Sequence, residues 1–115
     1  MIKIKVLHSG GRRGEILWEF LRGEADFSEV TSLEEADLVL VAGVAQIPTE
    51  GLTPDNYRKM VVFYTEGEDV GGFAGAALAR DHYNLLGCEA YPKDKDDLIG
   101  ALILYESELE NPPVF

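Results

Sequence analysis

The residues best suited to chemistry lie together near the amino terminus, in a loop rich in glycine and arginine. Arg12 and Arg13 carry guanidinium groups, which match the geometry of phosphate and carboxylate. Glycines let backbone N–H groups approach an anion closely, and a helix that starts just after the loop points its positive end toward it. The sequence therefore predicts an anion-binding loop made by Ser9, Gly10, Gly11, Arg12, Arg13 and Gly14. Walker and GxGxxG spacings are absent, so the alternative is a tight turn whose arginines offset an acidic chain.

A second glycine-rich loop, residues 65–72, is expected on the same edge of the fold. It contributes acids at Glu66, Glu68 and Asp69. His8 directly precedes the first loop and can exchange a proton near neutral pH. His8 with Glu66 is thus a candidate catalytic pair. The acids are expected to be solvated near a helix amino terminus, so we predict no metal site. The alternative is that their carboxylates hold Mg²⁺ through oxygen ligands. Further ligand-binding positions expected in these loops are Gly43, Thr65, Gly71 and Gly72.

Two residues are similar to those of response-regulator receivers, which place Thr or Ser after strand four and Lys after strand five. Thr65 and Lys93 stand at those places. The receiver's phosphorylated aspartate after strand three is replaced by Ala42-Gly43, and its acidic pair after strand one by His8-Ser9. The sequence thus argues against a phosphorylatable receiver. In general layout the chain also resembles cellobiose-type IIB phosphocarriers, but their nucleophilic cysteine is absent.

Alternating strand and helix patterns must position these loops. Leu38–Ala42 and Met60–Tyr64 are continuously apolar, as expected of central strands covered on both faces. We predict one α/β domain over residues 1–115, with a doubly wound, mostly parallel five-stranded sheet in the flavodoxin-like order 2-1-3-4-5, a Rossmann-like three-layer sandwich. The expected strands are Ile2–His8, Phe27–Thr31, Leu38–Ala42, Met60–Tyr64 and Cys88–Tyr91; the expected helices are Glu15–Arg22, a short one from Thr53-Pro54, one ending near Leu86 with Gly87 as its stop, and Asp94–Leu109.

The connection from Phe27–Thr31 to Leu38 is short for a crossover between parallel strands. Ser32 and Glu35 have capping-box spacing, which predicts one helical turn there. The alternative is that Phe27–Thr31 pairs only marginally. On the preceding helix, Trp18 falls off the apolar stripe and is expected to be half-buried, with contact to a ligand or partner as the alternative.

The composition and charge of the chain exclude several classes of protein. The formal net charge of -11 over 115 residues argues against general nucleic-acid binding. No apolar run is long enough for a membrane span, and the start lacks a secretory pattern, so we expect a cytoplasmic protein. The one cysteine, Cys88, is expected to be a buried structural thiol. The many Glu and few Gln, Asn and Met residues suggest a thermophilic source.

The helix Asp94–Leu109 is apolar nearly all round. We expect Leu98, Leu102, Tyr105 and Leu109 to face the sheet, with Ile99, Ile103 and Leu104 outward. An outward apolar patch predicts a homodimer formed through this helix, although Ile99 and Ile103 could instead be covered within one chain.

Three functions follow from these patterns. The first is a small binding or regulatory module for an anionic small molecule, a nucleotide or phosphorylated metabolite. The second is a small hydrolase or transferase that uses His8 with an acid from Glu66–Asp69. The third is an acidic adaptor that binds a protein and has no small-molecule site. The sequence names no cofactor.

Overall fold

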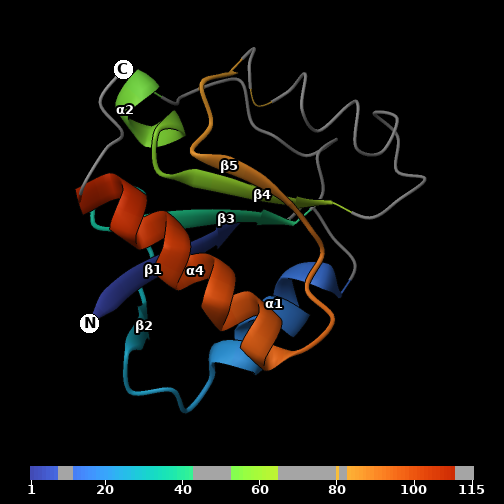
Figure 1. Ribbon diagram of the computed structural model, residues 1–115. Coiled ribbons are helices and arrows are strands. Elements are labelled where there is room, and N and C mark those ends of the chain that lie inside the picture. Colours follow the sequence, from blue (N-terminus) through green and yellow to red (C-terminus); the bar gives the residue numbers. More distant parts are fainter. Residues whose placement is uncertain (8–11, 43–52, 65–79, 81–82, 111–115) are drawn as a thin grey trace.

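The computed structural model describes residues 1–7, 12–42, 53–64, 80 and 83–110. Its centre is a parallel sheet of five strands in the order β2-β1-β3-β4-β5 (Figure 1). This confirms the predicted flavodoxin-like α/β architecture. The strands are β1 (Ile2–Leu7), β2 (Phe27–Glu29), β3 (Leu38–Ala42), β4 (Met60–Tyr64) and β5 (Gly87–Ala90); the helices are α1 (Arg13–Leu21), α2 (Pro54–Tyr57) and α4 (Lys95–Glu110).

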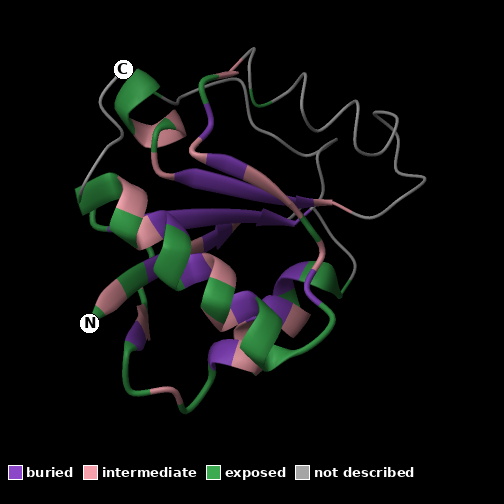
Figure 2. Cartoon of the chain, in the orientation of Figure 1, coloured by how far each residue is buried: buried purple, intermediate pink, exposed green. Residues whose placement is uncertain are grey.

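The two continuously apolar runs are the central strands, as predicted. All five residues of β3 and the first four of β4 are buried, which Figure 2 shows as the purple centre of the sheet. Helices α1 and α4 lie on one face of the sheet and pack on Ile4, Leu40 and Phe63. Val39, Val41 and Val62 point to the other face. Burying each such side chain contributes about 1.5–3 kcal/mol to the free energy of folding.

Strand β2 pairs fully with β1, from Ile2 opposite Phe27 to Ile4 opposite Glu29. The strand ends at Glu29, two residues earlier than expected. The connection to β3 contains turns but no helix. Ser32 Oγ accepts a hydrogen bond from the Glu34 N–H at 3.2 Å, so the capping-box pattern forms a local turn instead.

Lys59, directly before β4, holds this short connection in place. Its Nζ donates hydrogen bonds to the carbonyl oxygens of Leu33 and of Ala36, the latter at 3.0 Å. Asp37 then joins the connection to β1, because its Oδ2 accepts from the Lys3 N–H at 2.9 Å and its own N–H donates to the Lys3 carbonyl at 2.8 Å. Side-chain and backbone hydrogen bonds thus hold this connection, where one helical turn was expected.

The segment before β5 differs from the prediction. Asn84 has a φ of 57°, a left-handed conformation that ends a helix and that Asn tolerates better than most residues. The predicted end of this helix, near Leu86 with Gly87 as its stop, was therefore wrong. Gly87 is the first residue of β5, where a β-carbon would lie 2.3 Å from the Tyr105 ring. Close packing, not a helix end, accounts for this glycine.

Helix α4 faces the sheet with Leu98, Leu102 and Tyr105, as predicted. Its last turn differs, because Leu109 is exposed. Ile99, expected outward, is half-buried and packs against the core of this face, whereas Ile103 and Leu104 are exposed at 56% and 55%. On β5, Cys88 is half-buried, and not buried as predicted.

Candidate functional site

The candidate site lies where the sheet order reverses. Strand β1 runs between β2 and β3, and Leu7 pairs with Val41 near the carboxyl ends of β1 and β3. Helix α1 begins at Arg13, after a five-residue connection from β1, so its amino terminus lies at this edge. Ligands of open parallel sheets bind in the crevice at such a switch point.

The structure describes three of the predicted site residues, Arg12, Arg13 and Gly14. The others lie outside the described residues: His8, Ser9, Gly10, Gly11, Gly43, Thr65, Glu66, Gly71 and Gly72. The proximity of His8 to Glu66, which the enzymatic hypothesis requires, therefore stays a prediction.

Arg12 occupies the N-cap position of α1, and its side chain forms ion pairs with two glutamates of that helix. Its Nη2 lies 3.0 Å from Glu19 Oε1, and its Nε lies 3.9 Å from Glu15 Oε2. The Arg12 side chain is 70% exposed. Ion pairs this exposed contribute about 0–1 kcal/mol, so an anion at the helix amino terminus could compete for the guanidinium. The side chain of Arg12 does not cap the first turn of α1, and Gly14 within this turn is buried.

Tyr91, directly after β5, reaches across to the start of α1. Its hydroxyl donates a hydrogen bond to the Arg13 carbonyl oxygen at 2.6 Å. Burial raises the Tyr91 pKa, with the Arg13 charge lowering it and the Glu19 charge raising it. The phenol thus stays protonated near neutral pH and can keep donating this bond. Sequence analysis missed this contact; the only signal was that Tyr91 ends a strand at the ligand-facing edge.

Other site types have little support in the described part of the chain. No group of three or more His, Cys, Asp and Glu side chains there is arranged to hold a metal ion. No helix among the described residues combines the length and apolar character needed to cross a membrane.

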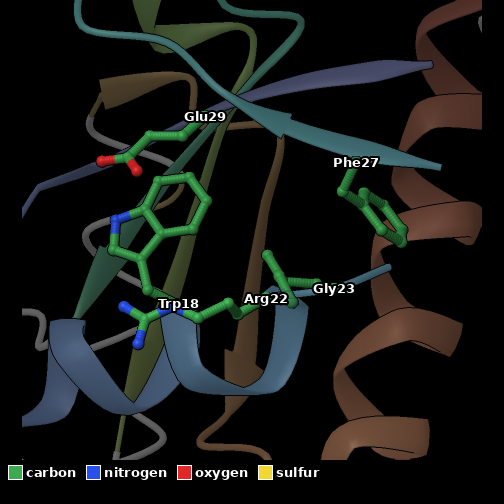
Figure 3. A pocket seen from close by; sticks show the side chains of 6 residues that line it. Trp18, Arg22, Gly23, Phe27 and Glu29 are labelled. Carbon is green, nitrogen blue, oxygen red and sulfur yellow. The ribbon is translucent and has the colours of Figure 1, made fainter. Parts of the chain in front are cut away.

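A separate hollow lies at the other end of α1, beside the edge strand β2. It has a volume of about 210 Å³ and is lined by Trp18, Leu21, Arg22, Gly23, Phe27 and Glu29. Figure 3 shows the Trp18 indole between the Glu29 carboxylate and the Arg22 side chain, with Phe27 further along the strand. Trp18 is half-buried, as expected. The sequence did not predict this hollow, because it forms only where side chains of α1 and β2 come together in the fold.

Comparisons with known proteins add little on function. No protein-family model matches the sequence, and no curated protein matches it. Among solved structures, the chain is similar to the solution structure of a response regulator protein from Burkholderia multivorans, with 20% identity, 100% of each chain covered and a TM-score of 0.48. Nothing about the activity of this chain follows from a likeness at that level.

Proposed function

We propose that this protein is a small α/β binding or regulatory module that takes an anionic ligand, a nucleotide or phosphorylated metabolite, at the amino terminus of α1. The observation that carries the proposal is the position of Arg12, Arg13 and the first turn of α1, which the Arg12 side chain does not cap, beside the β1–β3 switch point. Backbone N–H groups of that turn would meet the anion, and the two guanidinium groups would neutralise it.

The hydrogen bond from Tyr91 supports this proposal. It ties the segment after β5 to the Arg13 carbonyl, so the first turn of α1 is held to the segment that follows this edge strand. A turn that is already positioned loses less conformational entropy when a ligand binds.

The pairing of Arg12 with Glu19 would act against the ligand. Because this exposed pair must open for Arg12 to reach an anion, Glu19→Gln should tighten ligand binding by roughly two- to fivefold. Glu108→Gln removes the same charge from α4 and should leave the affinity unchanged. Equal effects of the two substitutions would mean that Arg12 does not contact the ligand.

A thermal-shift screen against nucleotides and sugar phosphates tests the proposal. A ligand at 100 times its Kd should stabilise the protein by about 2.7 kcal/mol, which raises the melting temperature by several degrees. The screen is run at low salt and at physiological salt, because salt weakens the attraction between an anion and exposed guanidinium groups. A melting temperature that no anion in the panel changes at either salt would contradict the proposal.

A further inference from the structure

The second feature with binding chemistry is the outer edge of β2, at the far end of α1 from the anion site. Strand β2 is an edge strand, with β1 on one side only. The Asp26 carbonyl and the Val30 N–H bond to β1 at 2.7 Å and 3.0 Å. Backbone groups alternate along a strand, so those of Phe27 and Glu29 face away from β1.

Three of these outward groups are available to another strand. The Phe27 N–H donates to the Glu24 carbonyl at 3.3 Å, which leaves the Phe27 carbonyl and both backbone groups of Glu29. Among the residues that the structure describes, no loop or side chain bonds these three groups. They form a short template on which an extended chain can add a strand.

The hollow beside β2 would receive a side chain from such an added strand. Phe27 and Glu29 both line it, and so do Trp18 and Leu21 of α1 (Figure 3). Its volume of about 210 Å³ is below the roughly 300–1,000 Å³ of pockets that hold small-molecule ligands. This size suits one apolar side chain of a peptide better than a whole small ligand.

The charges around the hollow indicate which residues should flank the inserted side chain in that added strand. Asp26 and Glu29 are exposed and make no ion pair with any described residue, whereas Glu24 is already paired with Lys95. The formal net charge of the chain is -11, so a basic partner is attracted at long range as well. The Arg22 guanidinium at the other rim of the hollow can donate to peptide carbonyls.

We propose that β2 is a docking edge for an extended, basic segment of a partner protein, which adds as a strand and inserts one apolar side chain between Trp18 and Phe27. Lys or Arg side chains two residues from the inserted one would meet Glu29 and Asp26. This inference is independent of the anion site, because it uses the other end of α1.

Trp18 makes a direct test available, because it is the only tryptophan of the chain. The probes are four heptapeptides that carry lysine two residues before and two residues after a central Leu, Ile, Phe or Met. At least one should change Trp18 emission saturably, and replacing its central residue by Ala should weaken binding about tenfold. Failure of all four up to about 1 mM would overturn the proposal.

Two comparisons separate strand addition from general attraction. The best peptide is N-methylated on alternate residues in either phase; one phase should lose about tenfold in affinity and the other should bind nearly normally. Glu29→Gln should weaken binding by more than Glu108→Gln, its charge-matched control on α4. Equal binding of the two methylated peptides, or equal effects of the two substitutions, would contradict docking at this edge. A concentration-dependent change in Trp18 emission without peptide, if it persists in the Ile103→Glu variant, would assign the edge to a second copy and also overturn the proposal.

Discussion

The aromatic ring of Tyr105 on α4 lies where a side chain on Gly87 of β5 would have to be. A β-carbon at Gly87 would be 2.3 Å from both Cε1 and Cζ of that ring. The Tyr105 hydroxyl also donates a hydrogen bond to Glu89, two residues further along β5. The ring therefore fixes α4 to the edge strand through contact at Gly87 and through the hydrogen bond at Glu89.

Gly87→Ala should lower the free energy of unfolding by about 1–3 kcal/mol, because the ring must move to make room. Gly100→Ala is the matched control. Beyond the surrounding helix backbone and its two chain neighbours, no described atom lies within 4 Å of its added β-carbon, and Ala is up to about 1 kcal/mol better than Gly inside a helix. Urea unfolding of both variants measures the difference. Equal stability of Gly87→Ala and the native chain would show that the ring yields without cost.

The Tyr105 hydroxyl predicts how stability depends on pH. Burial first, and then the hydrogen bond to Glu89, raise the Tyr105 pKa above its usual value near 10. The stabilisation is therefore complete below about pH 10 and is lost as the pH rises toward the folded-state pKa, since the unfolded tyrosine ionises first. Tyr105→Phe should be less stable by roughly 1.5–3 kcal/mol near neutral pH and should lose less stability between about pH 10 and 11.5. Parallel pH profiles for the two proteins would rule this out.

Lys59 is expected to be the main support of the helix-free connection between β2 and β3. Lys59→Met removes the donor for the carbonyls of Leu33 and Ala36 and should cost about 1–3 kcal/mol of stability. Lys95→Met, which breaks a surface pair with Glu24, should cost no more than about 1 kcal/mol. Denaturant unfolding compares them, and a larger loss in Lys95→Met would contradict the role given to Lys59.

The buried strands and the sheet order were predictable from local patterns. Leu38–Ala42 and Met60–Tyr64 read as central strands because every residue is apolar, and both have the predicted bounds. The short helix α2 likewise begins at the predicted Thr53-Pro54, and Thr53 Oγ1 caps it by accepting a hydrogen bond from the Asn56 N–H at 3.4 Å. In these cases the signal and the structure both reside in a few neighbouring residues.

The features that the sequence did not predict depend on contacts between segments far apart in the chain. Gly87 looked like a helix stop because glycine has that role locally, but a ring 18 positions later explains it. Lys59 supports a connection more than 20 residues earlier, and Tyr91 bonds Arg13 across 78 positions. For the candidate site, the composition of the loop pointed to Arg12 and Arg13, but nothing local indicated that Glu19 pairs with Arg12.

Helix α4 predicts self-association. Ile103 and Leu104 are neighbouring exposed apolar side chains on α4, and such a patch is typical of an interface. We expect light scattering at tens of micromolar and physiological salt to give twice the 12.7 kDa mass of one chain. Ile103→Glu should return a folded monomer, because this side chain is 56% exposed. A monomer mass for the native protein would reject the dimer, and an unfolded variant would mean that Ile103 belongs to the core.

The most direct test of the proposed function is calorimetric titration of the native protein and of the paired variant Arg12→Ala, Arg13→Ala with the anion that stabilises the native protein most. The pair of substitutions should weaken binding at least about tenfold, or 1.4 kcal/mol. The melting temperature without ligand should change little, because the Arg12 ion pairs are exposed. Native affinity in the paired variant, with its fold intact, would contradict an anion site at the start of α1.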